Sequence, residues 1–119
     1  MPKVTHFEII GKDAAKSREF YSGLFGWQID ANNPMDYGIV PPMENGIGGG
    51  IAAAEPGSSP TTVIYVEVDA IQPYLDKAVS MGGKVTVERQ VIPGMVAFAQ
   101  FADPDGNVIG LAETAIPPA

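Results

Sequence analysis

The chain has few of the residues on which several kinds of site depend. Its 119 residues include no cysteine and one histidine, and seven basic residues stand against fourteen acidic ones. Without cysteine it can form no disulfide, no thiolate nucleophile and no cysteine zinc site. The net charge of -7 argues against nucleic acid and anionic membranes as partners, because both require a basic face.

Long apolar runs are also missing. No stretch approaches the length of a membrane span, and the first residues lack the pattern of a signal peptide, so we expect a cytoplasmic protein. Hydrophobic residues make up 45% of the chain and charged residues 18%, which is typical of a globular protein. We therefore expect one domain over residues 1–119.

The first half of the chain predicts a strand, a helix and then three short strands. Residues 4–10 alternate apolar and polar side chains like a half-buried strand. Asp13 is placed to cap a helix that Gly26 ends. The strands that follow are expected at residues 27–30, 37–40 and 47–51.

The second half predicts the same order again. It follows a linker rich in proline, glycine and serine at residues 55–61. A strand at residues 63–68 leads to a helix that Asp69 should cap and that should run to about Met81. Three strands are then expected, at residues 84–88, 95–101 and 107–112.

These patterns predict an α+β fold made of two βαβββ modules, at about residues 4–54 and 62–113. A single shift along the sequence takes Gly26 to Gly83 and His6 to Val63, so the repeat is one of pattern. We expect a curved mixed sheet that encloses a cleft, with a helix on the outer face of each module's sheet. Strand alternation directs one set of residues toward the cleft. This set comprises His6, Glu8, Ile10, Val63, Tyr65, Glu67, Val108, Gly110 and Ala112.

The stretch FADPDGNVIGLAE, residues 101–113, resembles a calcium loop at first sight. Counted from Asp103, however, Val108 stands where such a loop needs glycine, and Thr114 where it needs glutamate. Asp-Pro-Asp-Gly is good turn chemistry, and an apolar run follows it. The stretch is therefore predicted to be a turn and a strand.

Four segments of the chain are similar to those of a known family, namely REFYSGLFGW at residues 18–27, VEVD at 66–69, GGKV at 82–85 and FADPDGNVIGL at 101–111. Together they resemble the vicinal oxygen chelate superfamily, which includes glyoxalase, bleomycin-resistance proteins and extradiol dioxygenases. The resemblance covers about residues 4–113, and it is greatest to small bacterial glyoxalase-related proteins. It implies the paired-module fold, while the fold itself hosts many activities.

The resemblance also implies where a metal would be held. Enzymes of this family bind one divalent metal with two side chains from opening strands and two from closing strands. These positions fall on His6, on Val63, on Gly110 and near residues 48–50. Valine and glycine offer no side-chain ligand, and stable sites need three or four. We therefore predict no metal site and no cofactor.

The candidate acid–base residues are His6, Glu8 and Glu67. His6 is either a hydrogen-bonded imidazole within a strand or a group that polarises a ligand or transfers a proton. Glu8 and Glu67 share its strand parity and could assist it, or they could lie solvated at a rim.

The candidate ligand contacts are strand residues and glycines. Glycines in the strand at residues 47–51 indicate close approach of a neighbouring sheet or a flat ligand. Phe20, Tyr21, Phe25 and Trp27 are expected in the core instead, from their spacing. The predicted ligand-binding residues are His6, Tyr37, Gly49, Gly50, Val63, Tyr65, Met95, Phe98 and Gly110.

Three functions compete at this point. The first is a small-molecule-binding protein without the usual divalent metal, and the second is a lyase, isomerase or dioxygenase-like enzyme. Such an enzyme would use an atypical metal site, or His6 with Glu8 or Glu67 and no metal. The third is a structural or partner-binding module with a vestigial cleft. In each case the resemblance leads us to expect a homodimer.

Overall fold

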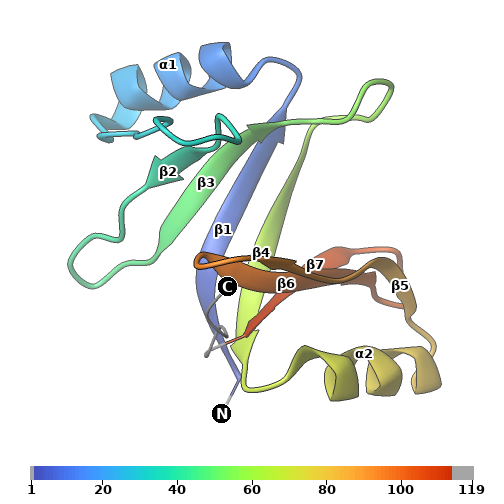
Figure 1. Ribbon diagram of the computed structural model, residues 1–119. Coiled ribbons are helices and arrows are strands. Elements are labelled where there is room, and N and C mark those ends of the chain that lie inside the picture. The colour runs from blue at the N-terminus through green and yellow to red at the C-terminus, as the bar shows by residue number, and fades with distance from the viewer. Residues whose placement is uncertain (1, 114–119) are drawn as a thin grey trace. The chain divides into compact units, whose positions relative to one another are not determined.

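The computed structural model describes residues 2–113, which form two compact units. The N-terminal unit is His6–Val63, and the C-terminal unit combines residues 64–113 with residues 2–5. Each unit packs one helix on strands that pair both parallel and antiparallel, so the predicted α+β class is confirmed (Figure 1). Neither helix in the described part of the chain is long and apolar enough to cross a membrane.

The N-terminal unit places its strands in the order β2-β3-β1. The central strand β3 runs antiparallel to β2 and parallel to β1. The helix α1 contacts β3. The elements are β1 (Lys3–Gly11), α1 (Ala14–Phe25), β2 (Gly38–Val40) and β3 (Gly48–Ala53).

The strand expected at residues 27–30 is wrong except for one bridge, between Asp30 and Ile39. The chain turns directly after this bridge, because the Asp30 carboxylate accepts a hydrogen bond from the backbone N–H of Asn32 at 2.8 Å. The following residues therefore form a loop that returns to β2.

The ends of α1 are as predicted. The side chain of Asp13 accepts a hydrogen bond from the backbone N–H of Lys16 at 3.1 Å. Gly26 closes the helix in the left-handed conformation, with φ of 71°, which glycine adopts without strain.

The aromatic residues around α1 do not form the core that their spacing predicts. No residue of α1 is buried, and Phe20 and Phe25 keep 62% and 57% of their surface exposed. The rings of Tyr21 and Phe25 instead lie against Trp27, with centroids 6.1 and 4.9 Å from that of Trp27. The Phe7 ring of β1 also lies near Trp27, with a centroid distance of 5.7 Å. The strand that α1 contacts, β3, begins with three glycines, which offer the helix no side chains to pack against.

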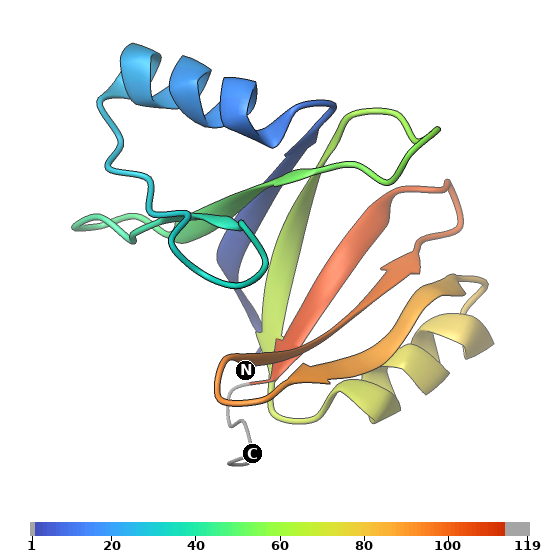
Figure 2. The same cartoon turned by 45° about the horizontal axis from the view of Figure 1, so that its top comes forward.

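The C-terminal unit has the complete βαβββ order that the sequence predicts. Its strands lie in the order β4-β7-β6-β5, with β4 and β7 parallel and the other pairs antiparallel (Figure 2). The elements are β4 (Thr61–Val68), α2 (Ile71–Ser80), β5 (Lys84–Ile92), β6 (Val96–Ala102) and β7 (Val108–Glu113).

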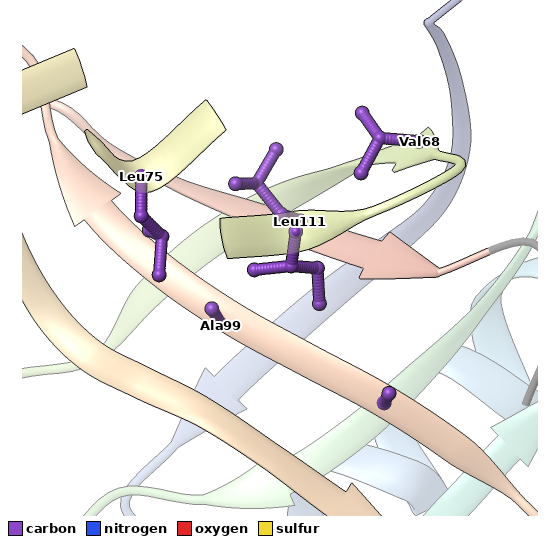
Figure 3. Packing of buried hydrophobic residues seen from close by; sticks show 6 residues of the cluster. Val68, Leu75, Ala99 and Leu111 are labelled. Carbon is purple, nitrogen blue, oxygen red and sulfur yellow. The ribbon is translucent and has the colours of Figure 1, made fainter. Parts of the chain in front are cut away.

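A continuous apolar core joins α2 to this sheet. Leu75 of α2 points at Ala99 of β6 and Leu111 of β7, and Val68 of β4 continues the layer (Figure 3). Ile71 and Leu75 are fully buried, so the helix is fixed by its apolar face.

The predicted cap of α2 by Asp69 is wrong. The N-cap residue is Ala70, which has no side-chain acceptor. The carboxylate of Glu113, at the end of β7, accepts the Ile71 N–H at 3.0 Å, and the Arg89 guanidinium binds the same carboxylate with two nitrogens. A cap from a distant strand depends on the tertiary fold, so local sequence could not indicate it.

The 103–107 segment is the predicted turn. Both carboxylate oxygens of Asp103 accept hydrogen bonds from Asn107, at 2.9 and 3.0 Å, and Asp105 N–H donates to the same side chain. These hydrogen bonds, chiefly the one from the Asn107 side chain, hold the pKa of Asp103 below its ordinary value. The Asp103 carboxylate is therefore used within the turn, and β7 begins directly after the turn at Val108.

The Glu113 cap generates a stability prediction. The hydrogen bond from Arg89 and then that from Ile71 hold the pKa of Glu113 below its ordinary value. The substitution Glu113→Gln should lower the free energy of unfolding by about 1 kcal/mol at pH 7, because the amide oxygen still accepts the Ile71 N–H but the charge that binds the Arg89 guanidinium is lost. Chemical denaturation should measure this loss. A depressed carboxyl pKa gives stability that is lost as the pH falls, so the difference between wild type and variant should shrink below about pH 4.3.

Glu88→Gln is the matched control, because Glu88 is an exposed residue of β5 in the same unit. It should leave the free energy of unfolding within about 0.5 kcal/mol of wild type. Equal stability of the Glu113 and Glu88 variants at pH 7 would contradict a stabilising charged contact between Arg89 and Glu113.

Candidate functional site in the N-terminal unit

Three polar side chains form a hydrogen-bonded chain in the N-terminal unit. His6 and Glu8 lie two residues apart on β1 and so share one face of the strand. The Tyr37 hydroxyl lies between them, 3.0 Å from His6 Nε2 and 2.9 Å from Glu8 Oε2. All three residues are half-buried. The structure thus brings together two predicted catalytic residues and one predicted ligand contact.

The Tyr37 backbone is held by a neighbouring side chain, that of Asn33. The amide oxygen of Asn33 accepts hydrogen bonds from the N–H groups of Tyr37 and Met35, at 3.0 and 3.2 Å. Its amide nitrogen donates to the Tyr37 carbonyl at 2.8 Å. One side chain therefore binds the peptide groups on both sides of the Tyr37 Cα.

Gly50 makes room for the Tyr37 hydroxyl. In the parallel pair of β1 and β3, Glu8 lies beside Gly50 and His6 beside Gly48. A Cβ atom at residue 50 would collide with the hydroxyl and ring of Tyr37. The phenol thus occupies the space into which a side chain of residue 50 would extend.

Two other predicted ligand contacts of this unit lie elsewhere. Gly49 packs against the Phe7 ring, on the face of the strands opposite to His6 and Glu8. Val63 is buried, with 3% of its surface exposed.

The C-terminal unit contains a similar tyrosine over a glycine. Tyr65 of β4 and Gln100 of β6 flank Gly110 of β7, and the Gln100 amide donates to the Tyr65 hydroxyl at 2.8 Å. The Tyr65 ring lies where a Cβ atom of residue 110 would be. Phe98 is half-buried and shares the strand parity of Gln100.

The two remaining predicted residues belong to the C-terminal unit and lie near solvent. The side chain of Glu67 is 31% exposed and lies 4.0 Å from the Lys3 ammonium. Met95 lies in the turn between β5 and β6 and is 47% exposed.

Burial decides the charge of the His6 imidazole. Loss of solvation lowers the pKa of His6 from its ordinary value, because the charged form is disfavoured away from water. The neutral ring is therefore the dominant form at neutral pH. A neutral imidazole can donate with one nitrogen and accept with the other.

Two residues of these arrangements, Asn33 and Gln100, are not among the predicted site residues. Asn33 belongs to an Asn-Asn-Pro sequence that indicates a loop, and asparagine there is typical of side-chain-to-backbone turns. Gln100 shares the strand parity of Phe98, which could have drawn attention to it.

The sequence model of the Glyoxalase/Bleomycin resistance protein/Dioxygenase superfamily matches residues 3–111. The chain belongs to this superfamily. The resemblance stated from the four sequence segments is thereby confirmed.

Similar proteins support the membership in the superfamily and show the range within it. The chain is 31% identical over 106 residues to the Mycobacterium bovis protein named "Putative glyoxylase CFP32", covering 83% of this chain and 41% of that protein. It therefore spans about two-fifths of that relative's length. The Mn(II)-bound glyoxalase of Novosphingobium aromaticivorans has a similar fold, with a TM-score of 0.64 and 18% identity over 98% of this chain and 40% of that one. Methylmalonyl-CoA epimerase of Mycobacterium tuberculosis has a similar fold as well, with a TM-score of 0.62 and 16% sequence identity. The match covers 94% of this chain and 87% of that one.

The positions where the resemblance implies metal ligands, which are His6, Val63, Gly110 and one of residues 48–50, hold a single side-chain donor and do not fit a divalent metal. Val63 has no donor, and tyrosine side chains fill the space beside Gly50 and Gly110. Among the residues that the structure describes, no three histidine, aspartate or glutamate side chains group closely enough to hold an ion. A protein site with fewer than three ligands competes poorly with water.

The tyrosine over Gly110 generates a second stability prediction. Gly110→Ala should lower the free energy of unfolding by about 1–3 kcal/mol, because the new methyl group collides with the buried Tyr65 ring. Urea denaturation measures the loss. Gly23→Ala is the control, because no atom lies within 4 Å of a Cβ there and alanine favours the helix. Wild-type stability of Gly110→Ala would show that the ring does not lie there.

Proposed function

We propose that this protein binds a small molecule without the superfamily's usual divalent metal, and that His6, Tyr37 and Glu8 are the polar anchor of its site. The observation that carries the proposal is the hydroxyl of Tyr37 between His6 Nε2 and Glu8 Oε2, at 3.0 and 2.9 Å. Ligand sites typically combine a few fixed polar groups with apolar surroundings.

The residues around His6, Tyr37 and Glu8 support such a site. The neighbouring strand β3 presents three successive buried glycines, and the space beside Gly50 lets the Tyr37 phenol reach His6 and Glu8. The Asn33 bonds keep Tyr37 from having to be ordered by the ligand, so less entropy is lost on binding.

The proposal that the site holds no metal rests on the side chains that could act as metal ligands. The carboxylate of Glu8 and the imidazole of His6 are both hydrogen-bonded to one phenol. A metal that recruited both would have to break this pair of bonds. The remaining superfamily positions add valine and glycine, which supply no ligand.

A second candidate is an enzyme that transfers a proton, as a lyase or an isomerase. The same chain of groups favours it, since imidazole, phenol and carboxylate can all act as acids or bases. The likeness to a relative named as a glyoxylase and to methylmalonyl-CoA epimerases agrees with this class. We propose Glu8 as the carboxylate partner of His6, because Tyr37 joins these two, whereas Glu67 lies beside Lys3. A dioxygenase-like activity has less support, because oxygen chemistry is usually carried by a metal or cofactor.

The proposal includes a homodimer in the cytoplasm. The superfamily resemblance supports the dimer, and the acidic, cysteine-free composition is compatible with a reducing compartment. The ligand itself is expected to be small, and neither nucleic acid nor membrane is expected as a partner.

Native mass spectrometry of freshly purified protein tests metal content and copy number together. We expect a mass of two chains with much less than one equivalent of zinc, nickel, iron or manganese, because the donor set is too small. Preparation without chelator is essential, since a chelator would remove the ion in question. A stoichiometric metal that is lost in His6→Ala would overturn the metal-free site, and a single-chain mass would overturn the dimer.

Thermal shift with a panel of small metabolites tests ligand binding. A compound that stabilises the wild type should bind Tyr37→Phe about tenfold more weakly, because the phenol that joins His6 to Glu8 is lost. Isothermal titration calorimetry measures the two affinities.

Tyr74→Phe is the matched control, because Tyr74 is an exposed tyrosine of α2 in the other unit. It should bind the compound like the wild type. Equal affinities for Tyr37→Phe and Tyr74→Phe would place the ligand site away from this chain of groups.

A further inference from the structure

We infer that Tyr37, positioned by Asn33 and Gly50, fixes which nitrogen of His6 carries the proton, so that Nδ1 is the nitrogen with which His6 accepts a proton or a hydrogen bond. This inference rests on the proposed function for its relevance to a ligand. Its structural part concerns the protein alone.

The direction of the two hydrogen bonds follows from counting protons. A phenol has one proton to donate, and Tyr37 donates it to Glu8 Oε2 at 2.9 Å. An ionised carboxylate only accepts, so this direction is also the one that its charge favours. The contact of 3.0 Å between Tyr37 and His6 must then be donated by the Nε2–H of His6.

The tautomer of His6 follows from this direction. With a proton on Nε2, the neutral imidazole has none on Nδ1. Above the ordinary imidazole pKa the ring is neutral, so one of its two nitrogens carries a proton and the other accepts. A ligand that uses His6 therefore meets an acceptor and must bring a hydrogen-bond donor, such as a hydroxyl, an ammonium or an acidic C–H group.

Asn33 and Gly50 are positioning residues in this arrangement. Asn33 fixes the Tyr37 peptide with an acceptor and a donor, at 3.0 and 2.8 Å. Gly50 leaves the space that the phenol occupies. The Arg18 guanidinium also contacts this loop, because it forms an ion pair with the carboxylate of Asp36 at 3.6 Å.

The proton relay that this geometry permits is balanced. His6 Nδ1 takes a proton from the ligand, while Nε2 gives its proton to the Tyr37 oxygen and Tyr37 gives its own to Glu8. One proton enters and one reaches the carboxylate, which becomes neutral. The ligand keeps the electron pair of the broken bond, as an enolate or alkoxide would.

The single histidine makes the test direct, because its imidazole gives the only such signals in a ¹⁵N-labelled protein. Long-range ¹H–¹⁵N correlation at pH about 8, above the ordinary imidazole pKa, identifies the protonated nitrogen. We expect protonated Nε2, unprotonated Nδ1 and slow exchange of the Nε2 hydrogen with water. In Tyr37→Phe this exchange should be about fivefold faster, because its hydrogen-bond acceptor is lost.

Variants at the positioning residues separate a specific role from a general one. Gly50→Ala should accelerate the exchange like Tyr37→Phe, whereas Gly23→Ala, which adds the same methyl group in open space, should not. Asn33→Ala should also accelerate it. Asn33→Asp should lie between, because aspartate keeps the acceptor for the Tyr37 N–H but cannot donate to its carbonyl.

Protonated Nδ1 in the wild type would overturn the inference, and so would equally slow exchange in wild type and Tyr37→Phe. If the Nε2 hydrogen of His6 exchanged as slowly in Asn33→Ala as in the wild type, Asn33 would not be a positioning residue. Circular dichroism checks each fold, and if Gly50→Ala unfolds, Tyr37→Phe decides the matter because it adds no atoms. Since no ligand is needed, a panel without a binding compound weakens the proposed function and leaves this result standing.

Discussion

In each unit, the closing strand runs parallel to the opening strand and places a glycine beside it. Glu8 lies beside Gly50 in the N-terminal unit, and Tyr65 beside Gly110 in the C-terminal unit. Because glycine has no Cβ, the space above the closing strand is open to a side chain from a neighbouring element. A tyrosine fills it in both units, and the polar character of each site depends on that tyrosine.

The two tyrosines reach their glycines by different routes. Tyr65 comes from the opening strand itself, and its hydroxyl accepts a hydrogen bond from Gln100 on the next strand. Tyr37 comes from a loop that Asn33 holds together, and its hydroxyl joins a histidine to a glutamate. The first arrangement is buried and joins three strands, which is typical of a structural role. The second is half-buried and links three groups that can exchange protons, which is typical of a functional one.

The superfamily to which the chain belongs is broad, and this chain shows how its scaffold can carry a different site. The positions where the resemblance implies metal ligands carry one histidine, a valine and glycines, and tyrosine side chains occupy the space beside Gly50 and Gly110. The same α+β framework hosts many activities in this superfamily.

Local sequence determined the parts of this protein whose causes are local. Asp13 and Gly26 bound α1 by cap chemistry, Asp103 and Gly106 set the turn before β7, and alternation gave the strand faces that carry His6 and Glu8. The βαβββ order of the C-terminal unit also followed from the order of these signals, while the N-terminal unit lacks one predicted strand and the cleft stays a prediction.

Tertiary structure alone decided the contacts between residues far apart in the chain. Glu113 caps α2 across 42 residues, the aromatic residues of α1 stack around Trp27 with much of their surface exposed, and Tyr37 reaches His6 across 31 residues. The hydrophobic periodicity of the sequence cannot predict such contacts, because they depend on strand register and on the space that a missing Cβ leaves. The sequence therefore identified His6, Glu8 and Tyr37 separately, and only the pairing of β1 with β3 beside the Asn33 loop joined them into one site.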